Sequence, residues 1–203
     1  MKIKLKICGV KRLEDAIELN KIGVDYIGIV NESKSIRFAP YEFNKIVKIY
    51  VDKPVVSVRV SGDINEILSR ETVADYIQIH RVLTDEELEA LSAYDTKRVI
   101  LYVPTSLDYI PYLLKIQRYN TEILFDSPKK GVVNDPKILR ILLDYHRDAG
   151  VGGGINLENI YNYIVLEPKW IDVSSGVEIS PGVKDLNKVK ALKEVIDSWK
   201  VRV

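Results

Sequence analysis

The sequence predicts an α/β fold of eight alternating strands and helices, and three observations support this. Short apolar runs of strand length recur along the whole chain. Each run is followed by a segment with apolar residues at helical spacing, often with a capping residue or a glycine at its end. No linker, low-complexity tract or long charge run interrupts the alternation. We therefore expect a single domain over residues 1–203.

The first strand, which begins at residue 3, leads to the only cysteine of the chain. Its apolar residues alternate with polar ones and Gly9 ends the pattern, so Cys8 lies where a strand gives way to a loop. A helix over residues 13–22 follows. Gly23 is suited to cap the C-terminus of this helix.

The remaining elements repeat this order. Further strands are expected at residues 24–30, 55–60, 76–79, 98–103, 122–125, 149–151 and 170–173. Further helices are expected at residues 40–51, 63–72, 84–92, 106–117, 136–145, from 157 onward, and 186–199. Thr84 and Glu87 form a capping box at the start of one of them.

Eight strand–helix pairs in 203 residues leave about 25 residues for each pair. This is tight but feasible for a closed (β/α)8 TIM barrel. An open, doubly wound sheet uses the same alternation, so it is the structural alternative.

Composition excludes several classes of partner. Thirty basic and 29 acidic residues leave a net charge of +1, which gives no general attraction to nucleic acid or to an anionic membrane. One cysteine rules out an internal disulfide framework. No apolar run is long enough to span a bilayer, and the N-terminus leads directly into a strand instead of a secretory apolar region. We expect a cytoplasmic protein.

Several polar residues follow strands, and in a barrel the carboxyl ends of the strands form the active site. They are Cys8, Arg37 after the second strand, His80 at the fourth, Asp126 after the sixth and Asp172 in the eighth. Each also has a structural explanation: a lone cysteine is usually a buried apolar residue, an aspartate caps loops, an arginine is usually exposed, and a histidine is often satisfied within the fold.

Two of these side chains have chemistry that suits a reactive, anionic ligand. Asp126 leaves an apolar strand, where partial desolvation raises a carboxyl pKa toward that of a useful acid. Arg37 offers a planar fork that matches a carboxylate or a phosphate.

Glycine-bearing turns end the last two strands of the predicted barrel. They are Gly152-Gly153-Gly154 and Ser174-Ser175-Gly176. Small residues let backbone N–H groups approach an anion, and the loops after strands seven and eight are the usual phosphate site of these barrels. Tight-loop geometry explains either turn alone, but both together favour a phosphorylated small molecule. The triple glycine does not fit G-x-G-x-x-G, so we expect no nucleotide cofactor.

Taken in order, these residues resemble the phosphoribosylanthranilate isomerase family, the barrel enzymes of tryptophan biosynthesis, over essentially the whole chain. The resemblance rests on Lys6-Ile7-Cys8-Gly9, Ser35-Ile36-Arg37, Gln78-Ile79-His80, Phe125-Asp126-Ser127 and the stretches 152–160 and 172–185. The stretch that begins Asp172-Val173-Ser174-Ser175-Gly176-Val177-Glu178 is the most specific match.

The resemblance implies an Amadori rearrangement of N-(5-phosphoribosyl)anthranilate to 1-(2-carboxyphenylamino)-1-deoxyribulose 5-phosphate by general acid/base catalysis. Asp126 would be the acid that protonates the ribose ring oxygen, and Cys8 the base that removes the C2 proton. An electropositive rim is expected to lower the pKa of the Cys8 thiol below its reference value of about 8.5. No metal and no organic cofactor is implied.

The resemblance also implies how the substrate is held. Arg37 would pair with the anthranilate carboxylate, Asp172 would orient ribose hydroxyls or the enolamine, and His80 would contact the substrate. The phosphate would lie on Gly153, Gly154, Ser175 and Gly176.

The chain departs from the family pattern at three places. The usual proline before the arginine is Ile36, the usual glycine after the histidine is Arg81, and a glycine-rich stretch after the acid is replaced by residues 128–133. Because of the last change, the shape of the loop at residues 127–135 cannot be transferred from the family. The same holds for any contact that Lys129 or Lys130 makes with a phosphate or a carboxylate.

Two other functions are compatible with the pattern. A related isomerase of the histidine pathway, or one that serves both pathways, would have an aspartate in place of Cys8, so the cysteine argues against it. A catalytically silent phosphate-binding barrel is the second, and the presence of both Cys8 and Asp126 argues against that. Monomer and homodimer are both open.

Overall fold

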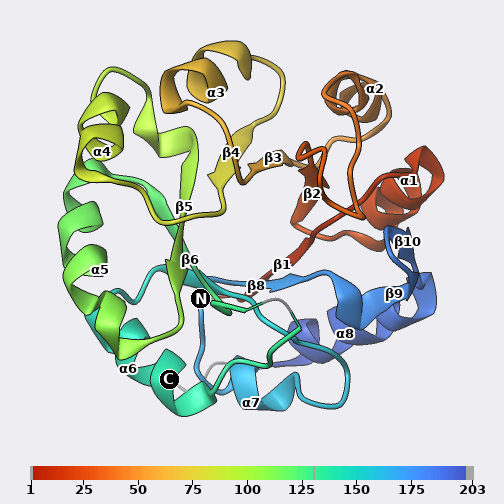
Figure 1. Cartoon of the computed structure of the whole chain (residues 1–203). Coiled ribbons are helices and arrows are strands. Elements are labelled where there is room, and N and C mark those ends of the chain that lie inside the picture. The colour runs from red at the N-terminus through yellow and green to blue at the C-terminus, as the bar shows by residue number, and fades with distance from the viewer. Residues whose placement is uncertain (1, 130, 200–203) are drawn as a thin grey trace.

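Eight parallel strands form the closed barrel expected from the sequence, in a computed structural model that describes residues 2–129 and 131–199. They follow one another around the ring in chain order, and the eighth pairs with the first (Figure 1). The strands are β1 (Lys4–Ile7), β2 (Tyr26–Val30), β3 (Val55–Arg59), β4 (Tyr76–Ile79), β5 (Val99–Pro104), β6 (Glu122–Asp126), β7 (Ala149–Val151) and β8 (Trp170–Val173). An open doubly wound sheet is excluded, because it would leave two unpaired edges.

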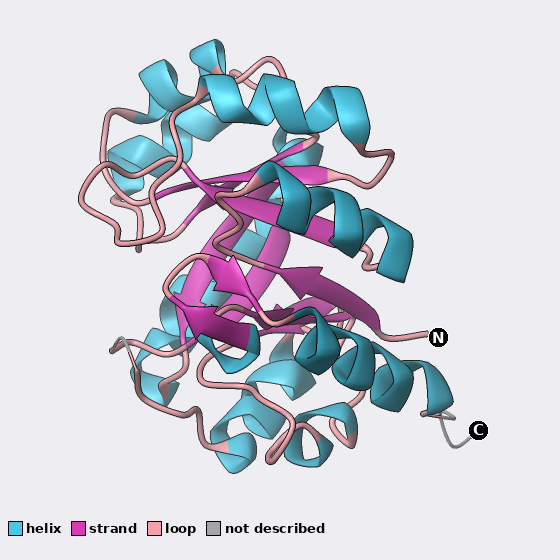
Figure 2. Ribbon diagram, turned by 90° about the vertical axis from the view of Figure 1, so that its right-hand side faces the viewer, coloured by secondary structure: helices cyan, strands magenta, loops and turns pink. Residues whose placement is uncertain are grey.

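Helices surround the ring on its outer side (Figures 1 and 2). They are α1 (Leu13–Ile22), α2 (Glu42–Tyr50), α3 (Ile64–Arg70), α4 (Asp85–Leu91), α5 (Ile110–Ile116), α6 (Pro136–Tyr145), α7 (Tyr161–Ile164) and α8 (Leu186–Ser198). Shorter 3-10 helices are η1 (Thr96–Arg98), η2 (Leu107–Tyr109), η3 (Gln117–Tyr119) and η4 (Ser175–Val177). Gly23 ends α1 in the left-handed conformation, and Thr84 and Glu87 make both bonds of the predicted capping box.

Apart from shifts of element boundaries, the structure differs from the predicted elements most clearly at residues 157–160 and 178–184. The helix expected from residue 157 begins only at Tyr161, because Asn156 and Asn159 bond to backbone N–H groups and hold residues 156–159 in a turn. An antiparallel pair, β9 (Glu178–Ser180) and β10 (Val183–Lys184), was not predicted. These strands are too short for an apolar period to reveal them.

The strand residues alternate between two apolar layers. One set packs between the barrel and the helices, with Leu5, Ile27 and Phe125 among its fully buried members. The other lies inside the barrel and consists of Tyr26, Val56, Val58, Ile100, Leu124 and Trp170. The partly buried Cys8 packs against this inner layer.

Trp170 fills the barrel interior because its neighbour in the sheet has no side chain. A Cβ atom added to Gly150 on β7 would lie 2.0 Å from Cε2 of the Trp170 ring. The tryptophan begins β8, so it closes the half of the barrel in which the strands start. Lys6 and Asp172 lie two residues further along β1 and β8 than Lys4 and Trp170, toward the ends of these strands.

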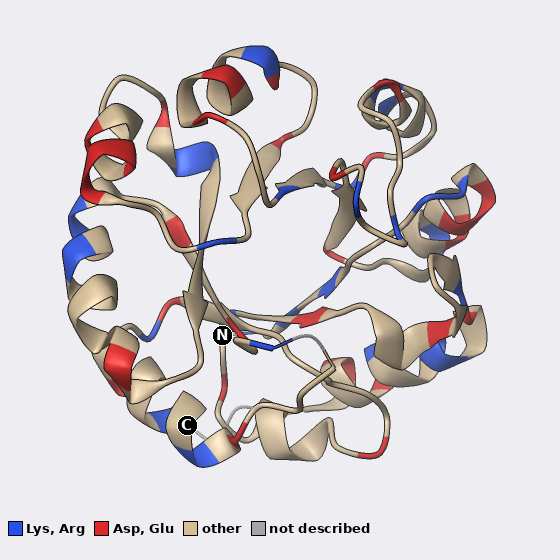
Figure 3. Cartoon of the chain, viewed as in Figure 1, with Lys and Arg blue, Asp and Glu red and all other residues tan. Residues whose placement is uncertain are grey.

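Charged residues occur on the outer helices and also on strands of the inner ring (Figure 3). Of the helices in residues 2–129 and 131–199, not one combines the length and apolarity needed to cross a membrane.

Candidate active site

The predicted site residues lie where the strands of the barrel end. Cys8 directly follows β1, His80 directly follows β4, Asp126 is the last residue of β6, and Asp172 lies in β8. The charges of Lys6 and Asp172 act on Cys8, His80 and Asp126 alike, which groups these side chains around one centre.

A buried ion pair lies beneath this centre. Lys6 on β1 is almost completely buried, and its Nζ donates to Asp172 Oδ2 at 2.8 Å. The second carboxylate oxygen, Asp172 Oδ1, is also buried and has no hydrogen-bond partner in the described part of the chain. Because an unpaired buried acceptor is costly, this oxygen is ready to accept a bond from a ligand hydroxyl.

Asp126 has the environment of a general acid. Burial, reinforced by the charge of Asp172, raises the pKa of its carboxyl to about 7. The Ser127 backbone N–H donates to Asp126 Oδ1 at 2.6 Å, which leaves Oδ2 directed elsewhere. The carboxyl therefore holds its proton over much of the range below neutral pH.

His80 faces that second oxygen as a neutral ring. Its Nε2 lies 3.8 Å from Asp126 Oδ2, and burial lowers the pKa of the ring to about 4. Gln78 Nε2 lies 3.1 Å from His80 Nδ1, and Tyr102 packs against the ring with 4.5 Å between centroids. A Gln78 amide that donates to Nδ1 would place the proton of the neutral ring on Nε2, toward the acid.

The structure corrects one expectation for Cys8. The thiol was expected to have a lowered pKa, but burial raises it, and the opposing effects of Lys6 and Lys184 are smaller. These two cations do not offset the effect of burial, and both are paired, Lys6 with Asp172 and Lys184 with Glu178. The residue as a whole is only partly buried.

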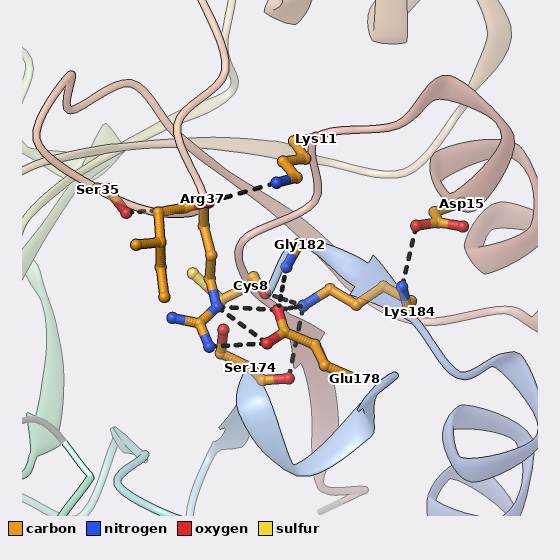
Figure 4. Close-up of polar contacts among 10 residues, drawn as sticks. Cys8, Lys11, Asp15, Ser35, Arg37, Ser174, Glu178, Gly182 and Lys184 are labelled. Atoms are coloured by element: carbon orange, nitrogen blue, oxygen red, sulfur yellow. Dashed lines mark hydrogen bonds and ion pairs between the residues drawn. The ribbon is translucent and has the colours of Figure 1, made fainter. Parts of the chain in front are cut away.

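Arg37 is held in a charged cluster instead of lying free at the rim (Figure 4). Its Nε and Nη2 donate to both carboxylate oxygens of Glu178, at 2.7 to 3.1 Å, and Lys184 Nζ donates to Glu178 Oε1 at 2.8 Å. Within residues 2–129 and 131–199, Arg37 Nη1 has no partner. A ligand carboxylate would thus meet a guanidinium whose orientation is already fixed.

The two glycine turns lie against each other. A Cβ atom at Gly176 would be 2.0 Å from the Ile155 carbonyl oxygen, and both Gly153 and Gly154 have positive φ. Their approach brings together four backbone N–H groups that make no hydrogen bond among the described residues, those of Gly153, Gly154, Ser175 and Gly176. This arrangement suits a phosphate.

The loop after β6 approaches the first of these turns. Asn134 Nδ2 donates to the Gly152 carbonyl at 2.7 Å, and Val133 lies against Gly154. Ser127 Oγ donates to the Lys129 carbonyl, while Lys130 lies outside the described residues. These contacts attach the C-terminal end of the loop to the glycine turn that follows β7.

Each candidate catalytic residue faces a glycine on the neighbouring strand. A Cβ at Gly28 on β2 would be 3.0 Å from Cys8 Sγ, and a Cβ at Gly152, just after β7, would be 3.1 Å from Asp126 Oδ2. These glycines leave the space that the thiol and the carboxyl occupy.

Sequence reasoning missed the contacts that Lys6, Glu178 and Lys184 make at the site. Lys6 is two residues before Cys8, so strand alternation places both on the interior face, and this was the available clue. Glu178 and Lys184 lie on the unpredicted β9 and β10. Among the described residues there is no group of three or more His, Cys, Asp or Glu side chains that could hold a metal ion.

Comparison with known proteins identifies the family of the chain. The family model described as N-(5'-phosphoribosyl)anthranilate (PRA) isomerase matches residues 5–195. An N-(5'-phosphoribosyl)anthranilate isomerase from Saccharolobus solfataricus is 49% identical over 195 residues, which cover 96% of each chain.

Two solved structures share the fold over nearly the whole chain. A monomeric form of the dimeric phosphoribosylanthranilate isomerase from Thermotoga maritima has a TM-score of 0.84 and 27% identity, covering 97% of this chain and all of that one. A phosphoribosylanthranilate isomerase in complex with reduced 1-(o-carboxyphenylamino)-1-deoxyribulose 5-phosphate has a TM-score of 0.80 and 27% identity, covering 95% and 97%.

Proposed function

The chain belongs to the N-(5'-phosphoribosyl)anthranilate isomerase family, and we propose that it carries out the family's reaction with Asp126 as general acid and Cys8 as general base. Isomerisation of N-(5'-phosphoribosyl)anthranilate in tryptophan biosynthesis is its activity. The observation that best supports the acid assignment is the Asp126 carboxyl, whose pKa of about 7 keeps it partly protonated at neutral pH.

In the first step Asp126 gives its proton to the ribose ring oxygen. The C1–O bond breaks as the lone pair of the anthranilate nitrogen forms a C=N bond, and the ring opens to an iminium cation. The Nε2–H of neutral His80 faces the carboxylate that remains, and it stabilises that charge without protonating it. In this proposal His80 stabilises the ionised form of Asp126 and also contacts the substrate.

In the second step the Cys8 thiolate removes the C2 proton. The electrons of the C–H bond form the enolamine, which tautomerises to the ketose. Because the pKa of the thiol is raised, the thiolate is a minor form of the free protein. The iminium formed in the first step places a positive charge beside the sulfur, which favours the thiolate when it is needed.

The rest of the site holds the substrate. The free Nη1 of Arg37 pairs with the anthranilate carboxylate, and Asp172 Oδ1 accepts from a ribose hydroxyl or from the enolamine. The phosphate lies on the backbone N–H groups of Gly153, Gly154, Ser175 and Gly176. Both anionic ends of the substrate are thus matched by donors.

The test is turnover of freshly generated phosphoribosylanthranilate, followed by the loss of its fluorescence. Wild type should be active, whereas Cys8→Ser and Asp126→Asn should each lose about 10²- to 10⁴-fold in kcat while retaining the circular dichroism of the folded protein. Folded variants with near-normal kcat would disprove the acid and base assignments.

Assembly and location are proposed in coarser terms. The Thermotoga maritima relative is described as a dimeric enzyme from which monomers were generated, and the proposal for this chain is a monomer or a homodimer. A cytoplasmic location remains a proposal that rests on the sequence.

A further inference from the structure

We propose that Arg37, Glu178 and Lys184 form a charged clamp that couples the base to the carboxylate-binding arginine, with Lys184 as the positioning residue of Cys8. The inference deepens the proposed function and rests on the roles given there to Cys8 and Arg37. We define the clamp as these three side chains, shown together in Figure 4.

Lys184 connects three separate segments at the mouth of the barrel. Its Nζ donates to the Cys8 carbonyl at 2.6 Å, to Glu178 Oε1 at 2.8 Å and to the Ser174 carbonyl at 3.5 Å. The side chain is 0% exposed, and the backbone N–H donates to Asp15 Oδ2. An ammonium group has three donor protons, and here each has an acceptor, so the end of β1 is tied to the end of β8 and to β9.

Glu178 transmits this position to Arg37. Its carboxylate is 5% exposed and accepts from Arg37, from Lys184 and from the Gly182 backbone N–H at 3.0 Å. A carboxylate with this many donors cannot move without breaking several charge-assisted bonds. Arg37 and the Cys8 backbone are therefore fixed relative to one another, although they come from different loops.

The clamp also supplies the net charge near the thiol. The charged groups that face Cys8 are Lys6 on β1, Asp172 on β8, Lys184 on β10, Glu178 on β9 and Arg37 in the loop after β2. Lys6 and Asp172 are paired and largely cancel. Two cations and one anion in the clamp leave one positive charge, which favours the thiolate.

This arrangement predicts opposite effects from its two buried partners. Lys184→Met makes the clamp neutral, and the pKa of Cys8 should rise by about one unit. Glu178→Gln leaves two positive charges, and the pKa should fall by about one unit. If the three side chains served only in packing, both substitutions would loosen Cys8 in the same way. Such a role would not lower the pKa of Cys8 when the Glu178 carboxylate is removed.

The experiment uses the fact that Cys8 is the only cysteine. The rate of alkylation by iodoacetamide is measured against pH, and the ¹³C shift of labelled Cys8 Cβ is titrated in parallel as a measurement that needs no access for a reagent. Lys11→Met is the matched control, because Lys11 donates to the Ile36 carbonyl in the same region and should leave the titration unchanged. Should Lys184→Met not fold, Glu178→Gln carries the test.

The clamp is supported if the pKa of Cys8 rises in Lys184→Met and falls in Glu178→Gln. Shifts of the same sign, or no shift in Glu178→Gln, would overturn it. Steady-state kinetics add a second readout: Glu178→Gln should raise KM severalfold, because Arg37 is no longer held in orientation. Thiol titration needs no turnover, so a wild-type protein without isomerase activity would refute the proposed function and leave the clamp to be judged separately.

Discussion

The raised pKa of Asp126 should make the protein less stable as the pH increases. The carboxyl has a pKa of about 7 in the folded chain against an ordinary value of 3.8, so the folded state binds its proton more tightly than the unfolded state does. Below about pH 3 both states are protonated and the residue adds no pH dependence. Above about pH 8 both are ionised, and at about 1.4 kcal/mol per pKa unit the buried charge costs about 4 kcal/mol of unfolding free energy.

Asp126→Asn removes this dependence without changing the shape of the side chain. Between pH 5 and pH 8, wild type should lose about 2.5 kcal/mol through this residue, and the variant should not. Urea unfolding gives the unfolding free energy of both proteins at both pH values. The quantity compared is the difference in unfolding free energy between wild type and variant, and how much that difference changes from the lower pH to the higher. Effects of the amide that do not depend on pH cancel in it.

Asp144→Asn is the matched control, since this carboxylate is exposed on α6. The difference in unfolding free energy between wild type and this variant should be nearly the same at both pH values. A value for Asp126→Asn within about 0.5 kcal/mol of zero, the usual range of a surface substitution, would refute the argument that burial sets the pKa of the acid. A value of the opposite sign would do so as well.

Two further predictions concern substrate binding and the barrel interior. Arg37→Ala should raise KM for phosphoribosylanthranilate much more than it lowers kcat, and an unchanged KM in steady-state assays would count against its pairing with the carboxylate. Gly150→Ala should destabilise the fold by about 1–3 kcal/mol in urea unfolding, because its new methyl group overlaps the Trp170 ring, and adding Trp170→Leu should restore part of the loss.

The architecture was predictable because strand and helix periods were consistent from one end of the chain to the other. The segments β4, β7, β8 and α6 have the boundaries expected from their apolar patterns. Period alone did not distinguish a closed ring from an open sheet. That choice depends on the pairing of β1 with β8, a contact between segments more than 160 residues apart.

The candidate site was predictable in its residue types but not in its electrostatics. Cys8 and Asp126 could be named from their places after strands, yet the direction of the thiol pKa was wrong. Burial in the closed barrel raises this pKa, and the charges that act on the thiol include Asp172 and Lys184, which come from the far end of the sequence. Interactions of this kind leave no period in a sequence.

The long reach of the Lys184 bond has a consequence for biosynthesis of the enzyme itself. Cys8 and Lys184 are 176 positions apart, and the ribosome synthesises the chain from its N-terminus while domains generally fold as units. A nascent chain that already carries Cys8, Arg37 and Asp126 has no β8 to close the ring and no β10 to fix the thiol. The closed ring and the bond from Lys184 to Cys8 therefore form only after these last strands have been synthesised.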